Sequence, residues 1–463
     1  MWKSLKWACV MLAMASVLGT MAWAQGAKEE ASAKGNEKVT ITVWGPLENY
    51  SDAEKKSWTF CVEEYKRRYP NVEVISVFSP AGTDYRQQYD KALMAGEAPT
   101  VTNLLPYVDV QSRASQGMAA DISSFVENWD LKKQGKVNTA MDPALQYKGK
   151  WYGVMDYIYI AGTVINKQSL AAAGGDINNL PKSWEEFNTF GQTATNLSIP
   201  RFGYLLVGME WNAWPFTPWV WSAGGEMVRD NGDGTYSIGF TEEPAIDAAM
   251  EWHDMVWKYH MTQKDTLKGW NDLRDDMQSG RGVFAFGRID HYDSEAERKY
   301  GVPRSNFSIM PIPPKDPGLQ GTAIAGGNAW IFSPTASQEQ LKAAWDFVQL
   351  FDYDEEFQIK KWEYENSIGG LTDRIPPRAD MIDKKFSMAT SWPEGRAEAC
   401  STTAAVAKME PWCPNWNNLK NILAPKLQKI LLTQDLSRNQ VAALLKEAAD
   451  EAYKAYPETF KKK

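Results

Sequence analysis

The amino-terminal part of the chain has the pattern of a strand, a helix and a second strand joined by short links. Residues 39–44 alternate as a strand, and residues 72–78 form a second apolar strand. Between them, residues 51–54 (SDAE) make a capping box, which predicts the start of a helix that ends before Pro70. Strands joined through a helix run parallel, so this opening predicts an α/β fold.

Strand signals return late in the chain, after a long stretch that is rich in helix patterns. The pattern predicts further helices at residues 84–95, 183–195, 244–260, 337–351, 417–433 and 437–456, and further strands at residues 100–105, 283–286, 307–311 and 329–332. One sheet would then be assembled from both ends of the chain. A length of 463 residues allows two lobes.

The first 24 residues have the features of a cleavable signal peptide. Lys3 and Lys6 precede an apolar run at residues 8–18 that is too short to span a bilayer, and residues 22–24 (AWA) form a cleavage site. We expect the mature protein to start at Gln25, with residues 25–38 as a flexible leader. This predicts a secreted, periplasmic or otherwise extracytoplasmic protein, and an uncleaved membrane anchor is the alternative.

Composition excludes some classes of function. The chain has 50 basic and 58 acidic residues and a net charge of −8, which argues against nucleic acid as a partner. Three histidines and no CxxC or HExxH motif predict no metal site and no cofactor. Cys61 lies on an apolar helix face and is predicted to be a buried thiol. Cys400 and Cys413 form either one local disulfide or two free thiols.

A series of short motifs resembles the extracellular solute-binding proteins of ABC transporters, specifically the family 1 sugar-binding group that includes maltose-binding proteins. The motifs are residues 41–44 (ITVW), 67–70 (RRYP), 91–101 (KALMAGEAPTV), 116–121 (QGMAAD), 148–154 (KGKWYGV), 164–167 (VINK), 181–187 (PKSWEEF) and 277–284 (MQSGRGVF). They span nearly the whole mature chain, and their order and spacing carry the resemblance. Departures at Thr100, Met155, Arg288 and Ile289 bear on the ligand more than on the fold.

The resemblance implies a two-lobed periplasmic-binding-protein fold of the class II type, with a mixed sheet flanked by helices in each lobe. It places residues 39–154 and 314–351 in lobe one and residues 155–313 and 352–463 in lobe two. The hinge crossings fall near residues 155–160 and 309–313. It also implies a small carbohydrate ligand in the cleft, delivery to ABC permease subunits, no catalytic residue and a monomeric protein.

Ligands of open α/β sheets bind beyond the carboxyl ends of the strands. The loops after the first and third strands therefore provide candidates: Trp44, Glu48, Asn49, Tyr107 and Asp109. Glu48 and Asn49 are alternatively solvated loop residues, and Asp109 is alternatively a helix cap. The hinge and the lobe-two strands add Asp156, Tyr157, Arg288, His291, Asn328 and Trp362. Arg288 alternatively pairs with Asp290 or Glu295.

The densest candidate segment is residues 211–221 (WNAWPFTPWVW). Its two prolines predict irregular backbone, which would leave four tryptophans outside regular helix. The apolar face of a sugar packs flat on an indole while its hydroxyls take polar partners. The resemblance favours Trp214 as the stacking platform, followed by Trp211. Trp219 is a further candidate and is alternatively a core residue, and we expect Trp221 to belong to the core.

Three functions are compatible with these features. The first is capture of a carbohydrate, most simply an oligosaccharide, for an ABC importer. A secreted glycoside hydrolase is the second, and it requires two carboxylates that face one glycosidic bond. The third is a binder of an acidic sugar or another small anion, which requires clustered basic groups or helix amino termini. The resemblance favours the first.

Overall fold

The structure is a computed structural model that describes residues 38–48, 50–80 and 85–462. The first strand–helix–strand unit is confirmed. In the sequence, β1 (Val39–Leu47) is followed by α1 (Asp52–Arg68) and β2 (Val72–Ser79), and the two strands pair in parallel. Ser51 begins α1 as predicted, because its hydroxyl accepts a hydrogen bond from the Glu54 amide and the Glu54 carboxylate accepts one from the Ser51 amide.

The strands form one sheet of mixed direction, with the order β2-β1-β3-β12-β6-β10-β7, while β11 pairs with β6 and β13 with β12. Its remaining strands are β3 (Val101–Pro106), β6 (Val154–Asn166), β7 (Phe202–Leu205), β10 (Gly282–Gly287), β11 (Phe307–Met310), β12 (Ala323–Phe332) and β13 (Ala407–Met409). The prediction of a sheet assembled from both ends of the chain is confirmed, since β12 lies between β3 and β6. Two short hairpins, β4 (Gln146–Tyr147) with β5 (Lys150–Trp151) and β8 (Val228–Asp230) with β9 (Tyr236–Ile238), lie outside this sheet.

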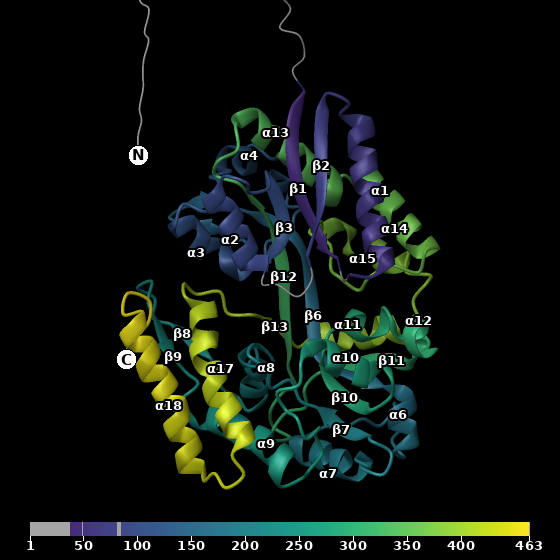
Figure 1. The fold of residues 1–463 in the computed structure, drawn as a ribbon, viewed down its shortest axis with the longest axis vertical. Coiled ribbons are helices and arrows are strands. Elements are labelled where there is room, and N and C mark those ends of the chain that lie inside the picture. The colour runs from purple at the N-terminus through teal and green to yellow at the C-terminus, as the bar shows by residue number, and fades with distance from the viewer. Residues whose placement is uncertain (1–37, 49, 81–84, 463) are drawn as a thin grey trace, which may run out of the picture. The chain divides into compact units, whose positions relative to one another are not determined.

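The long strands β6 and β12 connect the two lobes (Figure 1). The first part of β6 pairs with β12 and belongs to the lobe-one sheet, whereas its last part pairs with β10 and β11 in lobe two. The chain therefore passes from one set of strand partners to the other inside β6. It returns at the start of β12, after β11 has ended at Met310.

Helices cover the sheet in both lobes. Lobe one carries α1, α2 (Tyr85–Ala95), α3 (Val110–Ser115), α4 (Ser123–Glu127), α5 (Asp130–Lys133), α13 (Gln338–Val348), α14 (Glu355–Ser367) and α15 (Ile382–Ser387). Lobe two carries α6 (Lys167–Ala172), α7 (Trp184–Ala194), α8 (Ala213–Ser222), α9 (Glu243–Trp257), α10 (Trp270–Gln278), α11 (Ile289–Asp293), α12 (Ala296–Tyr300), α16 (Arg396–Ala404), α17 (Trp416–Leu432) and α18 (Arg438–Ala455).

The structure differs from the predicted lobe boundary at residue 352. The segment from α14 to α15 packs on lobe one, because Phe357 joins the lobe-one core and α14 lies against α1 (Figure 1). Ile375 also bridges to Ile158 at the hinge. The last crossing to lobe two therefore falls between α15 and α16, since α16 contacts β11. The helix pattern of residues 355–387 alone carries no information about which lobe it covers.

The three cysteines in the described residues are unpaired. Cys61 is buried in the lobe-one core, as predicted. Cys400 donates a hydrogen bond to Asp373, and Cys413 is buried in lobe two, so the free-thiol alternative describes this pair and the disulfide does not. The predicted signal peptide (residues 1–24) and most of the leader (residues 25–38) lie outside the described residues. No described helix is long and apolar enough to cross a membrane.

Candidate functional site

Three lobe-one strands lose their regular pairing near their carboxyl ends or at the hinge. Pro46 is an extra residue in β1 relative to β2, and Asp156 is an extra residue in β6 relative to β12. Asn103 and Leu104 of β3 face the single residue Trp330 of β12. Such bulges redirect side chains out of the regular alternation. All four bulge residues line one cavity, which lies where ligands of α/β sheets bind.

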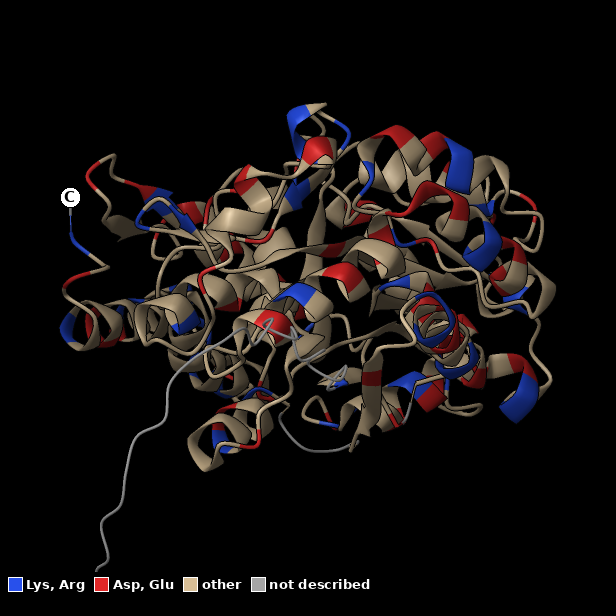
Figure 2. Ribbon diagram, turned by 90° about the horizontal axis from the view of Figure 1, so that it is seen from above, with Lys and Arg blue, Asp and Glu red and all other residues tan. Residues whose placement is uncertain are grey.

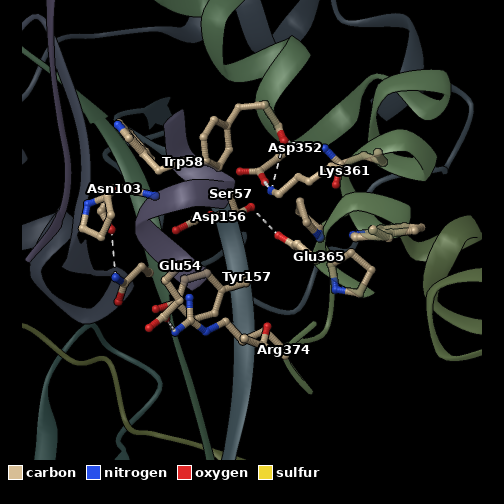
Figure 3. Close-up of a pocket in the computed structure, with 18 of the residues that line it drawn as sticks. Glu54, Ser57, Trp58, Asn103, Asp156, Tyr157, Asp352, Lys361, Glu365 and Arg374 are labelled. Atoms are coloured by element: carbon tan, nitrogen blue, oxygen red, sulfur yellow. Dashed lines mark hydrogen bonds and ion pairs between the residues drawn. The ribbon is translucent and has the colours of Figure 1, made fainter. Parts of the chain in front are cut away.

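This inner cavity encloses about 110 Å³. Figure 3 shows side chains from β3, β6, α1 and α14 converging on it. Its other walls are residues 370–377 and α15. The aromatic residues in its lining are Tyr50, Trp58, Tyr157, Phe351 and Trp362.

Buried charged groups form the back of the inner cavity. The Asp352 carboxylate accepts a hydrogen bond of 2.6 Å from the Trp330 indole and lies 3.7 Å from the Lys361 amine. Burial and the neighbouring Asp352 raise the pKa of the Asp156 carboxyl well above its usual range. Its Oδ2 atom has no hydrogen-bond partner among the described residues, so it is free to bond a polar group in the cavity.

Two tyrosines on one face of β6 each stack with an arginine. The guanidinium of Arg374 lies 4.5 Å from the centre of the Tyr157 ring, and that of Arg288 lies 4.9 Å from the Tyr159 ring. Asp290 contacts both arginines. Figure 3 shows Glu54, Tyr157 and Arg374 side by side below the inner cavity, and Arg374 forms an ion pair with Glu54.

The glycine pair of β12 makes room for these tyrosines. A Cβ atom at Gly326 would lie 2.4 Å from the Tyr159 hydroxyl, and one at Gly327 would lie 2.0 Å from the Tyr157 carbonyl oxygen. Any larger residue at either position would displace β6 or its side chains. The pair therefore allows the Tyr159 ring to lie directly over β12.

An aromatic face in lobe two adjoins Tyr159. Trp214 of α8 packs edge-to-face against Tyr159 and Phe286, with ring centres 6.2 and 4.9 Å apart. Trp211 lies 6.0 Å from Trp214, and Trp270 lies 5.4 Å from Trp211. His291 lies 5.1 Å from Trp270 and extends this group. We call the five residues together the aromatic face: Tyr159, Trp211, Trp214, Trp270 and His291. The Trp214 indole N–H has no hydrogen-bond partner among the described residues.

His291 is uncharged in this environment. Burial, assisted by the charge of Arg288, lowers its pKa to about 3. Its Nδ1 atom lies 3.4 Å from the Arg288 amide and accepts that hydrogen bond. Among the described residues, no group of three His, Cys, Asp or Glu side chains is arranged to hold a metal ion.

Comparison with known proteins identifies the kind of molecule that carries this site. The model of the bacterial extracellular solute-binding protein family matches residues 61–394. The chain belongs to this family. A search of curated proteins found no match to the sequence.

Solved structures of solute-binding proteins share the fold. An ABC transporter solute-binding protein from Thermotoga lettingae bound with α-D-tagatose is 20% identical, with a TM-score of 0.75 over 90% of this chain and 99% of the other. The maltose-maltodextrin binding protein of Alicyclobacillus acidocaldarius is 19% identical, with a TM-score of 0.69 over 89% and 100%. The UgpB protein of Mycobacterium tuberculosis, in complex with glycerophosphocholine, is 17% identical, with a TM-score of 0.70 over 90% and 98%.

These findings confirm the predicted family resemblance and the α/β periplasmic-binding-protein fold. The chain is a bacterial extracellular solute-binding protein. Members of this family are binding components and not enzymes, so the predicted absence of catalysis agrees with the family.

The structure brings most of the predicted site residues into two groups. Asp156, Tyr157, Asn328 and Trp362 line the inner cavity. Trp211, Trp214 and His291 belong to the aromatic face, and Arg288 stacks on it through Tyr159. The two groups meet at the tyrosine pair of β6, whose ring centres lie 6.3 Å apart. The role of each residue in binding remains a prediction.

Other predicted residues of this solute-binding protein lie apart from the inner cavity. The Tyr107 hydroxyl donates to the Glu410 carbonyl at 2.5 Å, and Asp109 accepts hydrogen bonds from Arg86 and Asn417. Both of these contacts to Glu410 and Asn417 join lobe one to lobe two. Trp44 is half-buried against the core, and Glu48 is an exposed turn residue. Asn49 lies outside the described residues.

The tryptophan-rich segment is helical, which corrects the prediction of irregular backbone. Pro215 lies in the first turn of α8, where backbone N–H groups make no hydrogen bond within the helix, so the proline removes none. Pro218 lies inside α8, and the helix continues through it to Ser222. Continuous helix places Trp214 and Trp219 on different faces. Trp219 is fully buried against Trp184, Phe187 and Tyr204. Its assignment to the ligand site is therefore wrong, and it is a core residue.

Several residues of the site were not among the predicted candidates. They are Tyr50, Glu54, Tyr159, Trp270, Asp290 and Arg374. The sequence held a signal for Tyr159. It lies two residues after Tyr157, so both side chains point to the same face of a strand. The glycine pair before Asn328 also indicates a strand that leaves room for a large neighbouring side chain. Arg374 gave no such signal, since it lies in a segment without regular structure that reaches the hinge only in the folded protein.

Proposed function

We propose that this solute-binding protein captures an uncleaved carbohydrate between its lobes, with Trp214 as the stacking platform, and delivers it to the membrane permease of an ABC importer. It would act from the extracytoplasmic side after removal of residues 1–24 and as a monomer. The closed form would present the loaded protein to the permease.

The observation that carries this proposal is the environment of Trp214. Its neighbours Tyr159 and Phe286 contact the ring in edge-to-face geometry, and the side chain is only partly buried. A sugar ring would add a further contact to the exposed part of this side chain, because its C–H face packs flat on an indole.

The inner cavity supports the same ligand class. The Oδ2 atom of Asp156 has no hydrogen-bond partner among the described residues, so it can accept a hydrogen bond from a ligand hydroxyl. Tyr50, Tyr157 and Asn103 add polar groups to the lining. The neighbouring structure bound with α-D-tagatose and the maltose-maltodextrin binding protein favour a carbohydrate, although their low identity carries the fold and not the ligand.

The geometry gives no support to glycoside hydrolysis. Glycosidases place two carboxyl groups about 5–9.5 Å apart, with the scissile bond between them. Asp156 and Asp352 instead lie among buried groups at the back of the cavity, where the charge of Asp352 raises the pKa of Asp156. Figure 2 shows acidic and basic residues interspersed along the described elements.

The test is a thermal-stability screen of the mature protein against a panel of mono- and oligosaccharides, followed by calorimetric titration of each stabilising sugar. Ligand that binds only the folded state raises the melting temperature. We expect at least one sugar to bind and to be recovered intact after long incubation. Failure of every sugar to bind would contradict carbohydrate capture, and recovery of cleaved sugar would favour hydrolysis.

A further inference from the structure

The arginine–carboxylate cluster lies between two cavities. Arg374 and Glu54 line the inner cavity, while Glu54 and Asp290 line an outer cavity of about 390 Å³ between α1 and α11. We infer that Asp290 makes the site selective for uncharged ligands, by neutralising both arginines beside it, so that uronic acids and sugar phosphates are excluded. This inference rests on carbohydrate capture and adds the charge of the ligand to it.

Asp290 occupies the binding fork of Arg288. Its two oxygens accept hydrogen bonds from Nε and Nη2 of Arg288, each at 2.7 Å. This two-pronged geometry is the one by which an arginine recognises the carboxylate or phosphate of a ligand. The Arg288 side chain is only 12% exposed. An anionic ligand could use this fork only by displacing a residue that is already ionised and buried beside it.

Arg374 is neutralised in the same way. It forms an ion pair with Glu54, and its Nη2 atom lies 3.4 Å from Asp290. The two arginines are thus matched by two carboxylates within one cluster. The pKa of Asp290 lies below its usual range because the attraction of Arg288 and Arg374 outweighs the effect of burial, which alone would raise it. Asp290 therefore stays charged across the physiological range of pH.

The outer cavity offers an anion no free basic group either. Its described lining contains six carboxylates, namely Asp52, Glu54, Asp290, Asp293, Glu295 and Glu297. The two arginines of this lining are paired, Arg298 with Glu295 and Arg304 with Asp293. Among the described lining residues, both arginines therefore already have a carboxylate partner, as Arg288 and Arg374 do beside them.

The experiment compares neutral sugars with the matching acids. The probes are D-glucose with D-glucuronate, D-galactose with D-galacturonate, the sugars that stabilise the protein in the screen, and inorganic phosphate. We expect the unaltered protein to bind no uronate or phosphate. In Asp290→Asn, Arg288 loses its carboxylate partner, and we expect affinity for a uronate or phosphate to rise at least tenfold. This gain should fall as salt is raised, because it is electrostatic.

Asp247→Asn is the matched control. Asp247 also bridges two basic residues, Lys315 at 2.7 Å and Arg438 at 2.5 Å, but it lies on α9, away from both cavities. We expect this variant to gain no affinity for anions. If Asp290→Asn does not fold, Glu54→Gln removes the partner of Arg374 and should produce a smaller gain of the same kind.

The outcomes separate the inference from the proposed function. Uronate binding by the unaltered protein as tight as that of the matching sugar would overturn the inference and leave carbohydrate capture standing. Folded variants without any gain for anions would also overturn it. A gain for phosphate in Asp290→Asn, with no sugar bound by any form, would support the role of Asp290 and contradict carbohydrate capture.

Discussion

Two tryptophans five residues apart in α8 illustrate how position decides the role of a residue. Trp219 is fully buried among aromatic neighbours in the lobe-two core. Trp214 is partly buried and lies at the lobe-two aromatic face. Both were candidates for ligand contact, and only the helix periodicity of α8 separates them.

Substitution of the two residues should give opposite results. Trp219→Ala should destabilise the protein by about 3–5 kcal/mol, as expected for a buried tryptophan. Trp214→Ala should lower the ligand-free melting temperature far less and weaken sugar affinity at least tenfold, because it removes the stacking surface. Melting curves and calorimetric titration measure the two effects. Normal sugar affinity in folded Trp214→Ala would remove Trp214 from the site.

Glu251 on α9 predicts a pH dependence of stability that is independent of the ligand site. Burial raises its pKa to about 8, and its Oε1 atom has no partner among the described residues. Between pH 4.5 and 8 the unfolded chain ionises at this residue while the folded protein keeps the proton. Stability therefore falls as pH rises through this window, by at most about 1.4 kcal/mol per pH unit.

Glu251→Gln removes this dependence. The free energy of unfolding, measured with urea, should exceed that of the unaltered protein at pH 8 and match it closely near pH 4.5. Glu394→Gln, at an exposed loop position, is the control and should change little at either pH. An equal effect of Glu251→Gln at both pH values would show that Glu251 is not protonated in the folded protein.

At the scale of elements, the glycine pair of β12 is the feature that shapes the site. Gly326→Ala would place a Cβ atom 2.4 Å from the Tyr159 hydroxyl. We expect the Tyr159 ring to move away from β12, which breaks its contacts with Arg288 and Trp214. Sugar affinity should fall by about tenfold or more. Calorimetric titration measures the loss.

Gly318→Ala is the control for this substitution, since a Cβ atom there would have nothing within 4 Å. It should leave both affinity and melting temperature unchanged. Unaltered affinity in Gly326→Ala would show that the position of Tyr159 does not matter for binding.

The sequence predicted where helices and strands begin better than it predicted which other elements they pack against. The capping boxes at Ser51 and Ser337 began helices as expected, because both signals depend only on neighbouring residues. The lobe to which α14 belongs depends on its packing against α1, which no local pattern encodes. The same limit explains the site: Asp156 and Trp214 followed from the resemblance, whereas Asp290 and Arg374 act through a contact between distant segments.

At the scale of the whole molecule, the two lobes are joined by paired strands and by side chains. Tyr107 and Asp109 of η1 (Tyr107–Asp109) bond to Glu410 and Asn417 of lobe two, and Arg374 reaches Asp290. Because these contacts span the two lobes, opening of the cleft must break them. Hinge bending within β6 and β12 is the motion that the connections allow.

Ligand should therefore shift the population toward the closed form and make the protein more compact. Small-angle scattering, recorded with and without the sugar identified in the screen, should show a smaller radius of gyration for the loaded protein. Trp214→Ala at the same sugar concentration is the control and should show a smaller change. An identical radius in both states of the unaltered protein would contradict ligand-driven closure.

The position of β12 also has a consequence for how the chain acquires its structure. Ala329 pairs with Leu105 of β3 on one side and with Met155 of β6 on the other, so a strand from late in the sequence lies between two early ones. The first third of the chain cannot complete its sheet until residues 323–332 have been synthesised. Contacts so distant in sequence form slowly, because a long loop must close first. The pairings of β12 with β3 and β6 are therefore expected to form after the pairing of β1 with β2.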